Sequence, residues 1–136
     1  MSFSSEIKLR NAVRDALIGD AAMLTKLGGP HVYDEAPRAK AGPYIVIAQG
    51  ETRDWSTMSD QGAEHLLTLE VWSQNTGARE ALDIAQCASE ILQEAALPMA
   101  GATCVHARIT SVETLRQQAN RFVRARIRLR ALVEIA

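Results

Sequence analysis

Residues 123–135, VRARIRLRALVEI, decide the fold, because apolar and arginine side chains alternate along them from Val123 to Ala131. Successive side chains of an extended strand point to opposite faces of a sheet, so this pattern predicts a strand with one buried face. The other face carries four arginines at every second position. They are Arg124, Arg126, Arg128 and Arg130.

Four more extended segments are expected, all of them N-terminal to this strand. Residues 105–110 alternate in the same way and predict its neighbour, with a turn near residues 117–120. Residues 44–48 form a compact apolar run, and residues 64–74 alternate apolar with polar side chains, so both predict strands. A short extended piece is expected over residues 31–33. The polar residues 51–62 show neither period and are expected to form a loop.

Helical spacing of apolar residues predicts three helices. The first covers residues 4–18, the second residues 20–27, and the longest runs roughly over residues 77–96 with an alanine-rich buried face. Gly28 can take the left-handed conformation that ends the second helix. The expected N-caps are Ser4 or Ser5, Asp20, and Asn75 or Thr76.

The expected fold is α+β, with a mainly antiparallel sheet of about four strands packed by one long helix and two N-terminal helices. The length of 136 residues fits a single domain over residues 1–136, with no linker or repeat. No apolar run approaches the ~18 residues that a membrane span requires, so no membrane association is expected.

Charge is divided unevenly along the chain, although the formal net charge is only -1. Residues 1–100 hold eight basic and 14 acidic side chains, or -6, whereas residues 101–136 hold seven arginines against two glutamates, or +5. A near-neutral total excludes a generally basic nucleic-acid binder and an acidic disordered tail. The division predicts two surfaces that complement each other electrostatically.

The arginine row is the first candidate site, and three interpretations stay open. It is a solvated sheet face whose cations pair within the chain, for example with Glu70, or a subunit interface, or a direct contact for nucleic acid. The strand lacks interleaved aromatic residues for stacking bases, which disfavours the last interpretation.

Trp55 and Met58 are the second candidate site, because they are large apolar residues inside the polar stretch 51–62. Such side chains gain nothing from an exposed loop unless they fold back on the core or dock on a partner. Both alternatives remain open from the sequence.

No residue pattern indicates catalysis, a metal or a cofactor. Cys104 and His106 lie two apart and are expected on one strand face, the proximity that a thiolate–imidazole pair needs, but no orienting group is evident. The histidines and cysteines fit no zinc-ligand spacing. Cys104 is therefore expected to be a packing residue, Cys87 a partly exposed free thiol, and the protein not an enzyme.

Several motifs of the N-terminal half resemble one known family. They are Asp20-Ala21, Gly28-Gly29, Val32-Tyr33-Asp34, Pro37 and Pro43-Tyr44. In this order they resemble the tail completion or tail terminator proteins of long-tailed bacteriophages. The detailed pattern is closest to the tail-terminator-like proteins of alphaproteobacterial gene transfer agents, phage-derived particles that package host DNA.

The resemblance implies a structural, virion-like component with no catalytic residues to transfer. It implies a homo-hexameric ring that caps the tail tube, terminates its polymerisation and joins it to the head-side neck. The implied partners are further copies of the chain, the tail tube protein and neck or connector proteins, with DNA in the channel as a further candidate for the arginine row. The implied location is the bacterial cytoplasm during assembly and then the tail–neck junction.

Two alternatives to this function remain. One is a neck or head-completion connector ring at the adjoining position. The other is a nucleic-acid-binding module that uses the arginine-rich C-terminal strand.

Overall fold

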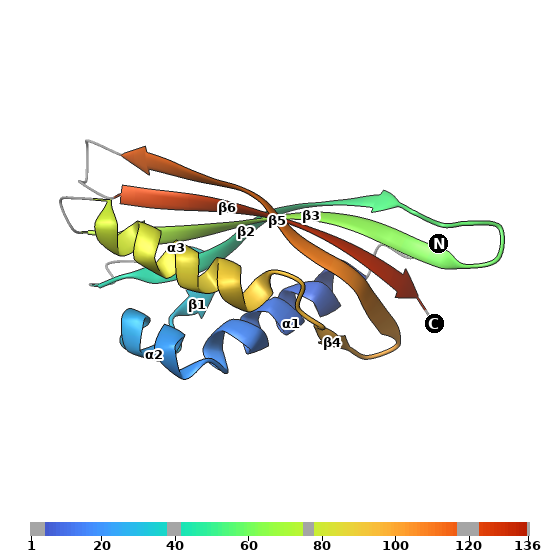
Figure 1. Ribbon diagram of the computed structural model, residues 1–136, viewed down its shortest axis with the longest axis horizontal. Coiled ribbons are helices and arrows are strands. Elements are labelled where there is room, and N and C mark those ends of the chain that lie inside the picture. Colours follow the sequence, from blue (N-terminus) through green and yellow to red (C-terminus); the bar gives the residue numbers. More distant parts are fainter. Residues whose placement is uncertain (1–4, 38–41, 75–77, 117–122, 136) are drawn as a thin grey trace.

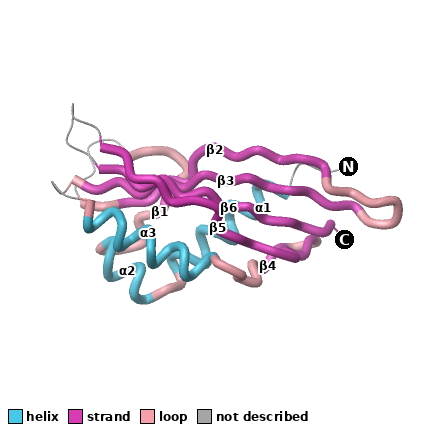
Figure 2. Tube along the Cα trace, turned by 45° about the horizontal axis from the view of Figure 1, so that its top comes forward, coloured by secondary structure: helices cyan, strands magenta, loops and turns pink. Residues whose placement is uncertain are grey.

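The computed structural model describes residues 5–37, 42–74, 78–116 and 123–135. Over these residues, three helices cover one face of a six-stranded sheet and leave the other face open (Figures 1 and 2). The elements are α1 (Ser5–Ile18), α2 (Ala21–Leu27), β1 (Val32–Tyr33), β2 (Tyr44–Asp54), β3 (Gln61–Ser73), α3 (Arg79–Leu92), β4 (Pro98–Met99), β5 (Ala102–Arg116) and β6 (Val123–Ile135).

The sheet has the strand order β1-β2-β3-β6-β5-β4, and every neighbouring pair is antiparallel except β1 with β2. The α+β class is confirmed, but the expectation of about four antiparallel strands is wrong, because the described sheet has six strands and is mixed. The two additional strands, β1 and β4, have two residues each. β1 lies within the short extended piece expected over residues 31–33, whereas β4 is unexpected, because two residues are too few to show a period.

The expected loop over residues 51–62 is also wrong in extent, since β2 continues to Asp54 and β3 starts at Gln61. The two strands form a long hairpin that projects beyond the helical layer (Figure 1). Because no helix covers this part of the hairpin, most of its side chains are exposed on both faces. No apolar alternation therefore marks it in the sequence.

The core lies between the sheet and the helices. Alternate residues of β6, from Val123 to Val133, are all buried, which confirms the alternation that predicted this strand. Facing them, α3 presents a buried surface of small side chains, as its alanine pattern predicts. The buried residues of α3 are Ala81, Ile84, Ala85, Ala88 and Leu92.

Helix α3 ends at Leu92, four residues before the expected end, and at 14 residues it is no longer than α1. The cause is tertiary. The backbone N–H of Ile109 donates to Gln93 Oε1 at 2.8 Å, and the N–H of Glu94 donates to the carbonyl oxygen of Ala107 at 2.8 Å. These bonds draw the chain onto β5 instead of into another helical turn.

The ends of α2 agree with the sequence. Asp20 accepts a hydrogen bond from the backbone N–H of Met23 at 2.9 Å, and Gly28 adopts a left-handed φ of 74°. The expected N-cap of the third helix at Asn75 or Thr76 is wrong, because α3 begins at Arg79 with Ala78 as its N-cap and no side-chain hydrogen bond there. The expected cap Ser4 and the turn at residues 117–120 lie outside the described residues.

A buried polar network joins α1 to the projecting hairpin. Ser5 Oγ lies 2.8 Å from His65 Nε2, and Thr52 Oγ1 lies 3.0 Å from His65 Nδ1. Thr52 donates its one hydroxyl proton to Glu6 at 3.1 Å, and Glu6 also accepts from Arg10 at 3.0 Å. The network therefore assigns the proton of a neutral His65 to Nδ1, with Nε2 accepting from Ser5.

This network predicts a loss of stability in mild acid. Burial lowers the pKa of His65 below its ordinary value near 6.5, and the nearby Glu6 carboxylate opposes that shift only in part. The unfolded chain then binds a proton more readily than the folded one, so the stabilisation is complete above about pH 6.5 and declines as the pH falls below it. We expect the free energy of unfolding in urea to be lower at pH 5.5 than at pH 7.5.

A matched pair of variants tests the assignment to His65. His65→Gln should flatten the dependence on pH between these values, whereas His106→Gln on β5 should keep the wild-type dependence. An unchanged slope in His65→Gln would show that another group is responsible.

The small face of α3 predicts a second effect on stability. Ala88 is fully buried against the sheet, so Ala88→Leu overfills the interface and should lower the free energy of unfolding by about 1–3 kcal/mol. Gln86→Leu places the same side chain at an exposed position of the same helix and serves as the control. Equal stability of the two variants in urea denaturation would contradict close packing at Ala88.

Candidate functional site

The arginine row lies on the open face of the sheet, opposite the helices. At one end of the row, Arg124 Nη1 lies 3.2 Å from Glu70 Oε2, and the Arg124 guanidinium lies 4.9 Å from the centroid of the Trp72 ring. Trp72 in turn stacks on Tyr44, with ring centroids 6.2 Å apart. This end of the open face is therefore a packed cluster of a cation, a carboxylate and two aromatic rings.

Two further arginines of the row are also paired. Arg126 lies 3.6 Å from Glu70 and 3.4 Å from Glu113, and Arg130 Nε lies 2.5 Å from Glu64. Pairing within the chain, one of the three interpretations of the row, is therefore present for three of its four members. Their charge is offset by carboxylates on β3 and β5.

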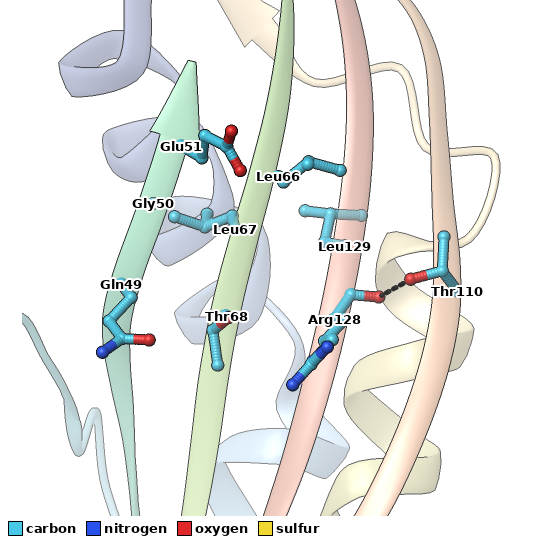
Figure 3. Close-up of a pocket in the computed structure, with 9 residues that line it drawn as sticks. All are labelled: Gln49, Gly50, Glu51, Leu66, Leu67, Thr68, Thr110, Arg128 and Leu129. Carbon is cyan, nitrogen blue, oxygen red and sulfur yellow. Dashed lines mark hydrogen bonds between the residues drawn. The ribbon is translucent and has the colours of Figure 1, made fainter. Parts of the chain in front are cut away.

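Arg128 differs from its neighbours, because its side chain is exposed and forms no salt bridge with any residue that the structure describes. It lines a shallow hollow of about 630 Å³ with Gln49, Thr68 and Thr110 around it and Leu66 beside it (Figure 3). The Thr110 hydroxyl donates to the carbonyl oxygen of Arg128 at 3.3 Å. A guanidinium in such a hollow can donate hydrogen bonds to a carboxylate or a phosphate of a partner.

Trp55 and Met58 occupy the tip of the β2–β3 hairpin. The Trp55 ring packs against the backbone of Gly62, where an added Cβ would lie 2.9 Å from Trp55 Cε3. The backbone N–H of Trp55 also donates to the carbonyl oxygen of Gly62 at 3.0 Å. Trp55 therefore folds back on its own hairpin and not on the core, with 39% of its surface exposed. Met58 is fully exposed.

Hydrogen bonds join residues within the tip. Asp54 Oδ1 accepts from the Ser56 hydroxyl at 2.7 Å, and the Thr57 N–H donates to the carbonyl oxygen of Asp60 at 2.8 Å. The tip thus presents an apolar residue between two aspartates, and it lies apart from the arginine row (Figure 1).

The expected placement of Cys104 and His106 on one face is wrong. A bulge between them pairs Cys104 with Val133, on the core side, and His106 with Leu132, on the open side. The extra residue shifts the alternation by one position, so the two side chains point to opposite faces. Cys104 packs against the core, as expected, and Cys87 is a partly exposed free thiol.

The thiols and the possible metal ligands of the described residues show no arrangement typical of a catalytic or metal site. Burial raises the pKa of both thiols above its ordinary value, so both stay protonated at neutral pH. Within the described ranges, no three His, Cys, Asp or Glu side chains gather into a metal-binding group. Among the same residues, no helix is long and apolar enough to span a membrane.

Of the three carboxylates that neutralise the arginine row, the sequence interpretation named Glu70 and missed Glu64 and Glu113. Glu64 and Glu70 occupy even positions of β3, on the same face as the arginines. The register places Glu70 opposite Arg126 and Glu64 diagonally across from Arg130, with which it forms an ion pair. Their alternation with Leu67 and Leu69 is visible in the sequence. Only the pairing of β3 with β6, however, shows that the carboxylates meet the arginines.

Comparisons with known proteins define the class. Residues 11–134 match the family model of the tail completion protein gp17, so the chain belongs to that family, a family of structural components of phage tails. One solved structure with the same fold is a chain in the virion of a native gene transfer agent particle. The two chains share 27% sequence identity and a TM-score of 0.88, over 98% of this chain and 99% of that chain.

The family predicted from the motifs of the N-terminal half is thereby confirmed. A search of curated proteins found no significant match.

The paired arginines predict a difference in stability between two variants. Glu70 is shared by Arg124 and Arg126, and its side chain is only 15% exposed, so Glu70→Gln should lower the free energy of unfolding by about 1.5 kcal/mol. Arg128→Gln should change it by less than about 0.5 kcal/mol, because Arg128 has no ion pair among the described residues. Urea denaturation that destabilises both variants equally would contradict this division of roles.

Proposed function

We propose that this protein forms a homo-hexameric ring that caps the tail tube, terminates its polymerisation and joins it to the head-side neck of a phage-like particle. The observation that carries the proposal is the full-length match to a chain of a gene transfer agent virion, together with membership of the tail completion family. In such a role, surfaces that bind other subunits replace an active site.

Two surfaces of the chain suit this role. The hairpin tip carries Met58, fully exposed, and Trp55, partly exposed, on a segment that projects away from the body. Exposed apolar groups on an ordered projection favour burial against a partner. We assign the tip to the contact with the tail tube protein.

The open face with Arg124, Arg126, Arg128 and Arg130 is the second proposed surface. Its one arginine without an ion pair among the described residues, Arg128, is placed to meet a carboxylate of a neighbouring subunit or the phosphates of DNA in the channel. A dedicated nucleic-acid module is the weaker alternative, because three of the four arginines are already paired with glutamates. A connector ring on the head side of the neck would use the same surfaces, and the tube assay below separates it from a terminator.

The assay measures tail tube growth. Purified tube protein polymerises with and without this chain, and tube lengths are counted by electron microscopy while native mass spectrometry records the ring, expected at six times 14.8 kDa. A terminator should bind one end of each tube and stop its growth. Tubes that elongate unchanged beside an excess of assembled rings would overturn the capping function and favour the connector ring.

Two variants test the role of the tip in this assay. Met58→Asp adds a charge at the exposed tip and should weaken tube capping at least about tenfold without changing the free energy of unfolding, since charge at an apolar contact is costly to bury. Leu82→Asp makes the same change at an exposed apolar position of α3 and serves as the control. Full capping by Met58→Asp would remove the tip from the tube contact.

Location in the particle follows from the same proposal. Assembly takes place in the bacterial cytoplasm, and the finished ring occupies the tail–neck junction. Immunogold labelling of intact particles should mark a single site there, and labelling along the whole tail would contradict it.

A further inference from the structure

The outer edge of β5 is partly covered and partly free. At its start, β4 pairs with Ala102 and Thr103, and farther along the segment after α3 occupies the backbone of Ala107 and Ile109. From residue 110 to residue 116, no described residue pairs with this edge. Seven residues of backbone thus face outward without a strand beside them, and the segment TSVETLR contains no proline or lysine to discourage pairing.

The outer edge of β2, at the opposite side of the sheet, is divided in the same way. β1 pairs with Ile45 and Val46, and Arg10 donates to the carbonyl oxygens of Ile47 and Ala48. From residue 50 to residue 54, no described residue pairs with this edge. Among the described residues, each side of the sheet therefore has a backbone segment without a partner. We call residues 110–116 the β5 window and residues 50–54 the β2 window.

We propose that the β5 window of one copy pairs with the β2 window of the next copy, so that the sheet continues from subunit to subunit. This inference rests on the proposed ring and names the contact that builds it. Within one chain, β2 and β5 run antiparallel, because three antiparallel steps separate them. A second copy in the same orientation thus brings its β2 antiparallel to β5, and such a head-to-tail contact can close into a ring.

The faces of the two windows limit the register. Glu113 and Leu115 lie on the open face of β5, and Glu51 and Arg53 lie on the open face of β2. A continuous sheet with one open face must pair these odd-numbered residues with one another. The allowed registers therefore differ by steps of two residues.

Charge favours one of three neighbouring registers. In the first register Glu113, which also pairs with Arg126, lies opposite Arg53, which pairs with Glu51 in its own chain. This register joins opposite charges across the contact, and Leu115 then faces Glu51. A shift of two residues in one direction places Glu113 opposite Glu51, and a shift in the other direction places Leu115 opposite Arg53 and Glu113 opposite Trp55. Of these three registers, only the first places side chains of opposite charge directly across from each other.

In the same register, opposite charges also approach each other on the helix side of the sheet. Arg116 of β5 lies on this side and falls opposite Gly50 of the next copy. The side of Gly50 is occupied by the Glu6 carboxylate, which lies 2.8 Å from where a Cβ of residue 50 would be. Glu6 thus offers a second acceptor for a cation from the neighbouring subunit.

This register implies a stagger that a ring can accommodate. Within one chain, the cross-strand partners place Glu113 in line with Glu70 of β3, and Arg53 in line with Glu64 of β3. Pairing Glu113 with Arg53 of the next copy therefore displaces that copy by six residues, or about 20 Å along the strands. Each copy adds four long strands, about 19 Å across the sheet. The strands would then tilt by about 45° to the ring axis, at the upper end of the range for closed barrels.

A cysteine pair tests the register. In a Cys87→Ala, Cys104→Ala background, Leu115→Cys with Glu51→Cys places two thiols directly opposite each other across the proposed contact. Oxidation should convert rings seen by native mass spectrometry into a covalent ladder of subunits. Leu115→Cys with Arg53→Cys is the control, because its thiols lie diagonally, about 7–8 Å apart at the backbone, too far for an unstrained disulfide.

A charge exchange tests the same contact without cysteines. Glu113→Arg and Arg53→Glu should each reduce the ring fraction at least about tenfold, and the double variant should restore it. Rings that give no ladder with the matched pair and no rescue in the double variant would overturn edge pairing and leave the ring itself intact. Wild-type protein that stays monomeric at high concentration and on tail tubes would overturn both proposals.

Discussion

The structure depends on the antiparallel ladder between β3 and β6, which joins thirteen residue pairs without a bulge. This ladder lies at the centre of the sheet and keeps the alternation of both strands in phase. Leu67, Leu69 and Val71 therefore share one face with the apolar residues of β6, and the helices cover that face. The same phase places the carboxylates of β3 beside the arginines of β6 on the other face.

The consequence for function is that most of the basic charge is satisfied within the chain. Glu70 and Glu64 offset cations that, from β6 alone, resemble a surface for nucleic acid. What remains available to partners is more local: Arg128 in its hollow, the tip of the hairpin, and two windows of free backbone at opposite edges of the sheet. Such separate and unlike surfaces suit a subunit that contacts several neighbours at once, as the proposed ring would require.

Sequence patterns predicted the elements that are buried on one side and regular over several residues. The short helix between Asp20 and Gly28 and the alternating strand at the C-terminus are examples, because their caps and burial are local or periodic properties. Patterns failed where a partner strand, and not a side chain, sets the structure. β4 is only two residues long, most side chains of the projecting part of the hairpin are exposed, and the bulge after Cys104 reverses an alternation without any sign in the sequence.

The sequence by itself determined the fold class, the buried face of β6 and the family, because these depend on composition, period and local motifs; the two groups of candidate interface residues stay predictions. Only the tertiary structure decided which arginines are paired, where Trp55 packs and which strand edges stay open. Those features depend on register, and register brings together residues as far apart as Glu64 and Arg130. A backbone edge has no side-chain signature, so its availability becomes visible only when all of its neighbours are in place.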